Sequence, residues 1–204
     1  MPTLLQIDSS PRSNSVSARL AAAFVAKWLR GHPGSTIIHH NTSLEHMPYP
    51  DQPTIDAYFT PPAVLTPAQK RALAISDRFV DELLAADVIV LSAPMWNLSI
   101  PASLKAWIDL IVREHRTFAF APDGVAPLVP PGKRVYIFTA RGGSYPAGSP
   151  FYALDHQEPY LRSIFGMIGL TQVKFIHAEH LSEGAEAAAE GVARAQAALE
   201  SIGT

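Results

Sequence analysis

The chain has 204 residues with a formal net charge of −2, and 48% of its residues are hydrophobic whereas 17% are charged. This composition excludes a disordered chain, and the lack of a basic stripe argues against a nucleic-acid partner. The absence of cysteine excludes disulfides, thiolate catalysis and metal centres with Cys ligands. We expect residues 1–204 to form one domain, because a chain of this length lies in the usual range for one.

No apolar run reaches the ~18 residues that a membrane span requires, so the sequence predicts no membrane partner. The first residues, 1–8, read directly as a strand and carry no basic region of the kind that opens a secretory signal. We therefore expect a cytoplasmic protein.

The first predicted strand, 3–8, is followed by a loop with five serines in nine residues, 9–17, and then by a helix over 17–30. A loop that joins the carboxyl end of a strand to a helix start binds phosphate readily, because free backbone N–H groups lie there. Serine hydroxyls, Asn14 and the charge of Arg12 add further donors. Ordinary capping of the helix by one serine is the alternative explanation. No GxxxxGK[ST] or GxGxxG motif is present, which argues against an NTPase and a dinucleotide fold.

A shorter and more polar run, 36–40, predicts a second strand at an edge of the sheet. It contains His39 and His40, whose side chains point to opposite faces, so we expect no joint metal site. Residues 41–65 are rich in Pro and Tyr and predict an excursion over the surface. The next helix, 66–86, begins with a capping box and a proline in its first turn. Its expected inward side chains are Leu73, Ile75, Phe79, Leu83 and Leu84.

An unbroken apolar run, 87–92, predicts a buried third strand, and apolar spacing predicts a helix over 102–112. The loop between them, 93–101, has a proline near each end and offers Met95, Trp96 and Leu98 as a flat apolar surface. Asn97 adds a donor and an acceptor in the middle of that surface. Such a loop suits a flat apolar ligand with a polar rim, although a tryptophan that only packs the core is the alternative.

A segment rich in aromatic residues, 113–122, carries Phe118 and Phe120 at alternate positions. These two rings are suited to covering a ligand or contacting a partner chain, and burial in the core is the alternative. The proline-rich residues 122–132 predict a connector without regular structure.

A fourth strand is predicted over 134–139 and runs into a loop, 140–145, that contains Gly142 and Gly143. Paired glycines at the carboxyl end of a strand let the backbone approach a ligand closely, and a plain turn is the alternative. The remaining elements are a helix over 155–168, a strand over 171–178 and a terminal helix over 183–202. We expect His177 and His180 to be packing and surface residues.

Strands and helices alternate along the chain, which predicts an α/β fold with a parallel sheet covered by helices on both faces. Right-handed crossovers and a central first strand favour the strand order 2-1-3-4-5. Three loops, 9–17, 93–100 and 140–145, then meet at one edge of the sheet. Together they predict a site for a phosphorylated planar ring.

The sequence resembles the FMN-dependent NADH:quinone oxidoreductases and azoreductases of the flavodoxin-like superfamily. The most specific match is the middle motif, Pro94–Asn97 followed by Ile100–Pro101 and the helix at 104–109. The serine loop, the segment 139–143 and the helix at 159–168 match as well, so the resemblance covers nearly the whole chain. It implies a flavodoxin-like three-layer sandwich with FMN as cofactor and NADH or NADPH as co-substrate.

The resemblance also implies roles for single residues. Hydroxyls and backbone N–H groups of the serine loop would hold the FMN phosphate. Backbone N–H groups of Asn97 and Leu98 would approach N5 and O4 of the ring, and those of Gly142 and Gly143 would lie near N1 and O2. The implied cofactor-binding residues are Ser9, Arg12, Ser15, Val16, Ser17, Pro94, Met95, Trp96, Asn97, Leu98, Thr139, Ala140, Arg141, Gly142 and Gly143.

The family works as a homodimer with sites at the interface, and Phe120 stands where an aromatic lid is found. Asn97, Phe120 and Tyr145 are the candidate catalytic contributors, since the flavin itself carries the chemistry. The chain departs from the family in having Ser144 and Tyr145 where a histidine is common after the glycine pair.

The activity implied is two-electron hydride transfer from NADH or NADPH to quinones and azo compounds, in a ping-pong sequence. A flavodoxin-like electron carrier is an alternative, but a net charge of −2 gives little support for its acidic docking surface. A non-catalytic FMN-binding module is another. No GxSxG motif is present, so a hydrolase is disfavoured.

Overall fold

The computed structural model describes residues 1–203 and contains a parallel sheet of five strands. The strand order is β2-β1-β3-β6-β7, which in chain order of these five is the predicted 2-1-3-4-5. The strands are β1 (Thr3–Asp8), β2 (Thr36–Asn41), β3 (Val88–Pro94), β6 (Arg134–Ala140) and β7 (Gln172–Ala178). The more polar strand β2 lies at an edge, as its composition predicts.

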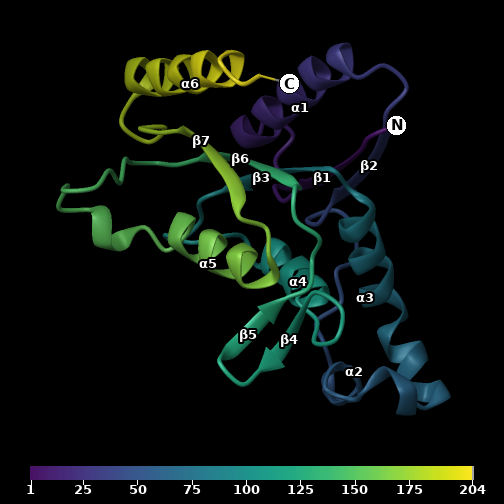
Figure 1. Ribbon diagram of the computed structural model, residues 1–204. Helices are drawn as coiled ribbons and strands as arrows, with labels where there is room; N and C mark the ends of the chain where they lie inside the picture. The colour runs from purple at the N-terminus through teal and green to yellow at the C-terminus, as the bar shows by residue number, and fades with distance from the viewer. Residues whose placement is uncertain (204) are drawn as a thin grey trace.

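Helices cover both faces of this sheet and complete the predicted three layers (Figure 1). One face carries α1 (Val16–Gly31) and α6 (Ala185–Glu200). The other carries α3 (Pro67–Ala85), α4 (Ala102–Ile111) and α5 (Glu158–Ile168). The flavodoxin-like sandwich is thus confirmed.

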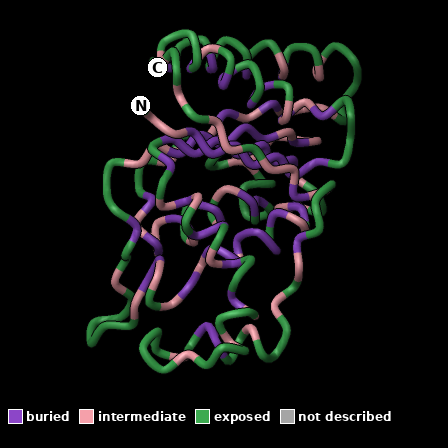
Figure 2. Tube along the Cα trace, turned by 90° about the vertical axis from the view of Figure 1, so that its right-hand side faces the viewer, coloured by how far each residue is buried: buried purple, intermediate pink, exposed green. Residues whose placement is uncertain are grey.

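The central strands are buried on both faces, which explains why their sequences are continuous apolar runs rather than alternating ones. Leu5, Ile89 and Ile137 pack under α3, α4 and α5, whereas Val90 and Phe138 pack under α1 and α6. Figure 2 shows this buried band crossing the middle of the molecule. On α3 the predicted inward position of Ile75 is wrong, since it is 44% exposed.

The register of neighbouring strands brings their carboxyl ends to the same edge of the sheet. Asp8 pairs with Ser92, Pro94 pairs with Ala140, and Ala140 pairs with Ala178. Because all the strands are parallel, the loops that follow them emerge on the same side. The three loops singled out in the sequence therefore meet where the parallel topology requires.

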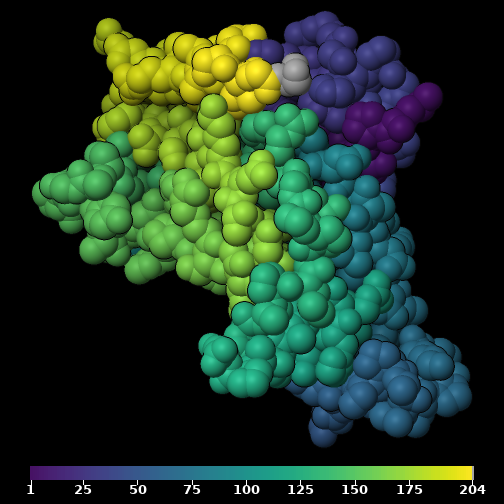
Figure 3. Space-filling view, in the orientation of Figure 1, coloured from purple at the N-terminus to yellow at the C-terminus, as the bar shows by residue number. Residues whose placement is uncertain are grey.

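Two segments carry structure that the sequence does not predict. The excursion after β2 contains α2 (Gln52–Tyr58) and a short 3-10 turn, η1 (Pro62–Val64). The end of the aromatic segment and the start of the expected connector form a hairpin from β4 (Phe118–Ala121) and β5 (Gly124–Pro127). Prolines at both ends of that stretch hide the strand signal, and an isolated two-stranded ribbon tolerates them. Both segments project from the lower end of the molecule in Figure 3.

A second 3-10 turn, η2 (Tyr152–Leu154), precedes α5. Among residues 1–203, no helix is long and apolar enough to cross a membrane.

Candidate functional site

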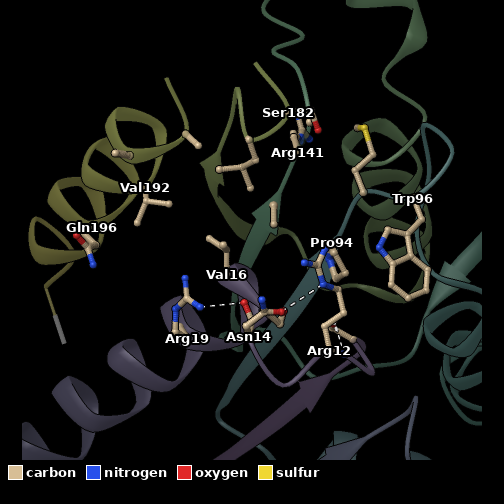
Figure 4. Close-up of a pocket in the computed structure, with 18 of the residues that line it drawn as sticks. Arg12, Asn14, Val16, Arg19, Pro94, Trp96, Arg141, Ser182, Val192 and Gln196 are labelled. Atoms are coloured by element: carbon tan, nitrogen blue, oxygen red, sulfur yellow. Dashed lines mark hydrogen bonds between the residues drawn. The ribbon is translucent and has the colours of Figure 1, made fainter. Parts of the chain in front are cut away.

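A cavity of about 660 Å³ opens at the edge of the sheet where β1, β3 and β6 end (Figure 4). All three predicted loops contribute to its wall. Nine of the predicted site residues line it, namely Arg12, Ser15, Val16, Pro94, Met95, Trp96, Ala140, Arg141 and Gly142.

The serine loop forms a capped helix start. The Ser15 hydroxyl accepts a hydrogen bond from the backbone N–H of Ala18 at 3.3 Å, so Ser15 is the N-cap of α1. The first N–H groups of a helix have no partner within the helix, and at α1 they belong to residues beside the cavity, such as Val16. An anion is stabilised at such a position.

Two predicted serines of this loop are fully buried and support it from behind. The Ser9 hydroxyl donates to the carbonyl oxygen of Ser92 at 2.7 Å. The Ser17 hydroxyl lies 3.1 Å from that of Ser15. Neither Ser9 nor Ser17 is among the residues that line the cavity.

Two arginines give this end of the cavity its charge. The Arg12 side chain donates from Nε to Oδ1 of Asn14 at 3.3 Å, and Arg19 donates from Nη1 to the carbonyl oxygen of Asn14 at 2.9 Å (Figure 4). No carboxylate lines the cavity, and no ion pair neutralises Arg12 or Arg19 among the described residues. The site therefore presents two cations at the start of α1.

The loop after β3 contains a tight two-residue turn. The backbones of Trp96 and Ser99 exchange both of their hydrogen bonds, at 2.9 and 3.0 Å. Between them Asn97 and Leu98 have φ angles of 48° and 68°. Left-handed backbone is tolerated by asparagine but disfavoured for leucine, and such strain clusters at functional sites. Asn97 lines a neighbouring cavity of about 500 Å³ together with Trp96.

The loop after β6 lies directly against the loop after β3. The backbone N–H of Met95 donates to the carbonyl oxygen of Ala140 at 2.9 Å. A Cβ atom added to Gly142 would lie 2.8 Å from the Ser182 hydroxyl oxygen, so a larger residue at this position would require the Ser182 side chain to move. Gly143 and Tyr145 lie beside a third cavity of about 510 Å³.

Arg141 contributes to the cavity wall but its side chain is almost fully buried, at 2% exposure. Its Nη1 lies 3.0 Å from Oδ2 of Asp155, and its Nε donates to Oε1 of Gln157 at 3.1 Å. Glu158 and Glu179 lie further out, at 3.8 and 3.7 Å. Its charge is thus compensated by carboxylates inside the protein, unlike the charges of Arg12 and Arg19.

Thr139 is buried beneath this loop and connects to an ion pair. Its hydroxyl lies 2.8 Å from Nδ1 of His177, whose Nε2 lies 2.8 Å from Oε2 of Glu158. The hydrogen bond from His177 lowers the pKa of Glu158 to about 2, with a further lowering from Arg162, although burial acts in the opposite direction. Both ring nitrogens of His177 thus have polar partners, a role that the expected packing residue does not predict.

Phe120 does not line any of these cavities. It stands on the β4–β5 hairpin, 64% exposed, and contacts Phe118 edge to face with ring centres 5.6 Å apart. Phe118 is buried, so burial in the core holds for Phe118 and not for Phe120.

Sequence reasoning missed the wall that α6 provides, along with Arg19. A Cβ atom on Gly191 would lie 2.0 Å from the carbonyl oxygen of Glu179, so glycine lets α6 approach the end of β7. Arg19 lies one turn beyond Ser15 on α1, a spacing that the sequence does show. The α6 wall consists of Ala188, Ala189, Val192, Ala193 and Gln196, and Leu181 and Ser182 from the loop before α6 extend it.

The cavity as a whole has a cationic end at α1 and an apolar end at Pro94, Met95 and Trp96. Its lining contains no histidine, lysine or carboxylate, so it offers charge, hydrogen bonds and flat apolar surface rather than a general acid or base. A ligand that combines an anionic group with a planar ring fits this arrangement.

Known proteins with this sequence pattern are numerous. The profile of the flavodoxin-like fold matches residues 2–202. The chain is 46% identical over 200 residues to an FMN-dependent NADH:quinone oxidoreductase of a Nostoc species, covering 98% of this chain and 97% of the relative. It is 44% identical over 203 residues to one of Azotobacter vinelandii, covering 99% of this chain and 100% of the relative.

Solved structures show the same similarity. An azoreductase from Bacillus anthracis superposes with a TM-score of 0.87 at 29% identity, and the match covers 98% of each chain.

Proposed function

Because the chain belongs to the flavodoxin-like family of FMN-dependent NADH:quinone oxidoreductases and azoreductases, we propose that it is an FMN-dependent NAD(P)H oxidoreductase acting on quinones and azo compounds. The observation that carries this proposal is the single cavity with a cationic helix start at one end and a flat apolar wall at the other. Phosphate and ring of one cofactor would occupy the two ends.

The phosphate would be held at the start of α1. The Ser15 hydroxyl and the backbone N–H groups of Val16 and Ser17 would donate to it, with Arg12 and Arg19 supplying charge. Ser9 and Ser17 would keep the loop in place through their buried hydroxyls.

The ring would lie against Pro94, Met95 and Trp96, with the strained turn at Asn97 and Leu98 along one edge. Backbone N–H groups at Gly142 and Gly143 would serve the opposite edge. Fixed donors of this kind stabilise negative charge without reorganising, which favours a two-electron cofactor.

When bound, FMN would accept a hydride from NADH or NADPH and deliver two electrons to the acceptor. Since the cavity lining holds no titratable acid or base, a quinone would take its remaining proton from solvent. Donor and acceptor would use the same open face in turn, which is a ping-pong sequence.

We further propose that two copies of the chain assemble into a homodimer with the sites at the interface. An apolar groove between α2, α4 and α5 supports this, and it joins the cavity beside Asn97 through Lys105 and Tyr160. Phe120 supports it too, because a large exposed aromatic side chain is suited to a protein contact. In this arrangement Phe120 would cover the site of the partner copy.

The proposal is tested by absorption spectroscopy. Protein incubated with FMN and then desalted should retain the flavin bands, lose them when NADH is added without oxygen, and regain them with benzoquinone. Flavin that stays bound but does not react with NADH would favour the electron carrier or the non-catalytic module. A protein that retains no flavin overturns the proposal.

A further inference from the structure

Three segments that are far apart in the sequence meet behind the apolar end of the cavity. They are the end of β3 with its turn, 93–99, the loop 140–145, and the residues 155–158 that lead into α5. The polar side chain at their centre is Gln157, which is fully buried.

Gln157 uses both ends of its amide. Its Nε2 donates to the carbonyl oxygen of Ala93 at 3.0 Å, and its Oε1 accepts from Nε of Arg141 at 3.1 Å. Ala93 directly precedes Pro94, and Arg141 directly precedes Gly142, so one side chain connects the two loops that flank the apolar end of the cavity.

Asp155 fixes Gln157 in its turn. Its Oδ1 accepts from the backbone N–H groups of Gln157 and Glu158 at 2.9 and 3.0 Å, while its Oδ2 pairs with Arg141. Arg141, Asp155 and Gln157 are all buried, with Nη2 of Arg141 left without a hydrogen bond, and burying an amide or a guanidinium costs more free energy when a further partner is lost. The cluster therefore has one favoured arrangement.

The same segment also restrains the strained turn. The backbone N–H of His156 donates to the carbonyl oxygen of Leu98 at 3.1 Å. Leu98 is the residue whose left-handed backbone is least favoured, at a φ of 68°. A hydrogen bond from outside the turn helps to hold this conformation.

We propose that Gln157 and Arg141 are positioning residues that hold the two loops flanking the apolar end of the cavity in one arrangement for the flavin ring. This inference rests on the proposed function. It assigns to Arg141 a task for its side chain that differs from contact with the cofactor, and it adds Gln157, which no motif in the sequence marks.

The test compares two ligands, FMN and riboflavin, because riboflavin has the same ring and no phosphate. Gln157→Met removes both hydrogen bonds at similar size. Gln157→Glu keeps an acceptor for Arg141 but loses the donor to Ala93, so it cuts only one connection. Ser163→Ala, at an exposed position of α5 whose hydroxyl bonds only to Pro159, is the matched control.

Each Gln157 variant should weaken FMN and riboflavin by the same factor, about tenfold for Gln157→Glu and more for Gln157→Met, because buried hydrogen bonds are lost at the ring end only. The limiting rate of flavin reduction at saturating NADH should also fall in the flavin-loaded variants, a change that a loss of folding stability alone does not produce. Ser163→Ala should match the wild type in all three measurements.

The inference is overturned if folded Gln157→Glu binds both flavins and is reduced by NADH as the wild type is. Because this variant is the milder one, the test remains valid if Gln157→Met fails to fold. Weakening of FMN alone, or an equal loss in Ser163→Ala, overturns it as well. A wild-type chain that binds neither flavin overturns the proposed function itself, which is a separate result.

Discussion

The cationic end of the cavity and its apolar end differ in how far apart their parts lie in the sequence. At the start of α1, Ser15 bonds to Ala18, and Arg12 and Arg19 both bond to Asn14. Each of these hydrogen bonds joins residues no more than five positions apart. At the apolar end, Gln157 bonds to Ala93, 64 residues away, and to Arg141. The first end is a local motif, whereas the second exists only in the assembled sheet.

This difference has an energetic side. The cationic end, which we call the local end, exposes its charges to water, where single ion pairs contribute little to stability. The apolar end, which we call the distant end, buries a guanidinium and an amide. The loss of either partner there lowers the free energy of unfolding strongly. Substitutions at the distant end should therefore affect folding and ring binding, and those at the local end should affect phosphate binding.

The largest effect is expected from Arg141→Met. It leaves Asp155 buried without its counter-ion, and breaking a buried pair in this way costs about 3–5 kcal/mol. Urea unfolding followed by circular dichroism should show a lower free energy of unfolding. Arg141→Lys, which keeps the charge, should lose less, and equal losses in the two variants would contradict an ionic explanation.

A smaller effect, present at neutral pH and lost in acid, is expected from Glu158→Gln. The folded pKa of Glu158 is lowered from 4.5 to about 2, so its contribution to stability is complete above pH 4.5 and is lost as the pH falls toward 2. The urea midpoint of the wild type should drop over this range more steeply than that of the variant. Parallel curves would show that the ion pair with His177 does not contribute.

At the local end, Ser15→Ala removes the cap of α1 and should cost about 1 kcal/mol of stability. The affinity for FMN should fall about tenfold through the lost donor to the phosphate, whereas riboflavin should bind as before. Equilibrium titration of flavin fluorescence measures both. If FMN and riboflavin lost affinity equally, the assignment of the phosphate to this end of the cavity would be contradicted.

The same distinction explains how much the sequence predicts. The fold follows from strand-length apolar runs and from helix caps such as that of Thr66, which are local signals. The serine loop is found for the same reason. Gln157 is not found, because nothing near it in the sequence indicates that its partners are Ala93 and Arg141. The strands β4 and β5 are missed because Pro122, which follows β4, and Pro127, which ends β5, resemble the prolines of a connector.

The turn at Asn97 and Leu98 falls between these cases. The sequence marks this loop for chemistry, yet a leucine does not predict left-handed backbone. Leu98→Gly should relieve that strain, and we expect a gain of about 0.5–1 kcal/mol, offset in part by the greater freedom of glycine in the unfolded chain. Thermal unfolding of the flavin-free protein measures it, with Ser99→Gly as the control outside the left-handed region. A destabilised Leu98→Gly variant would mean that the side chain of Leu98 contributes more by packing than its backbone costs. The turn would then be held by the leucine itself rather than by the bond from His156.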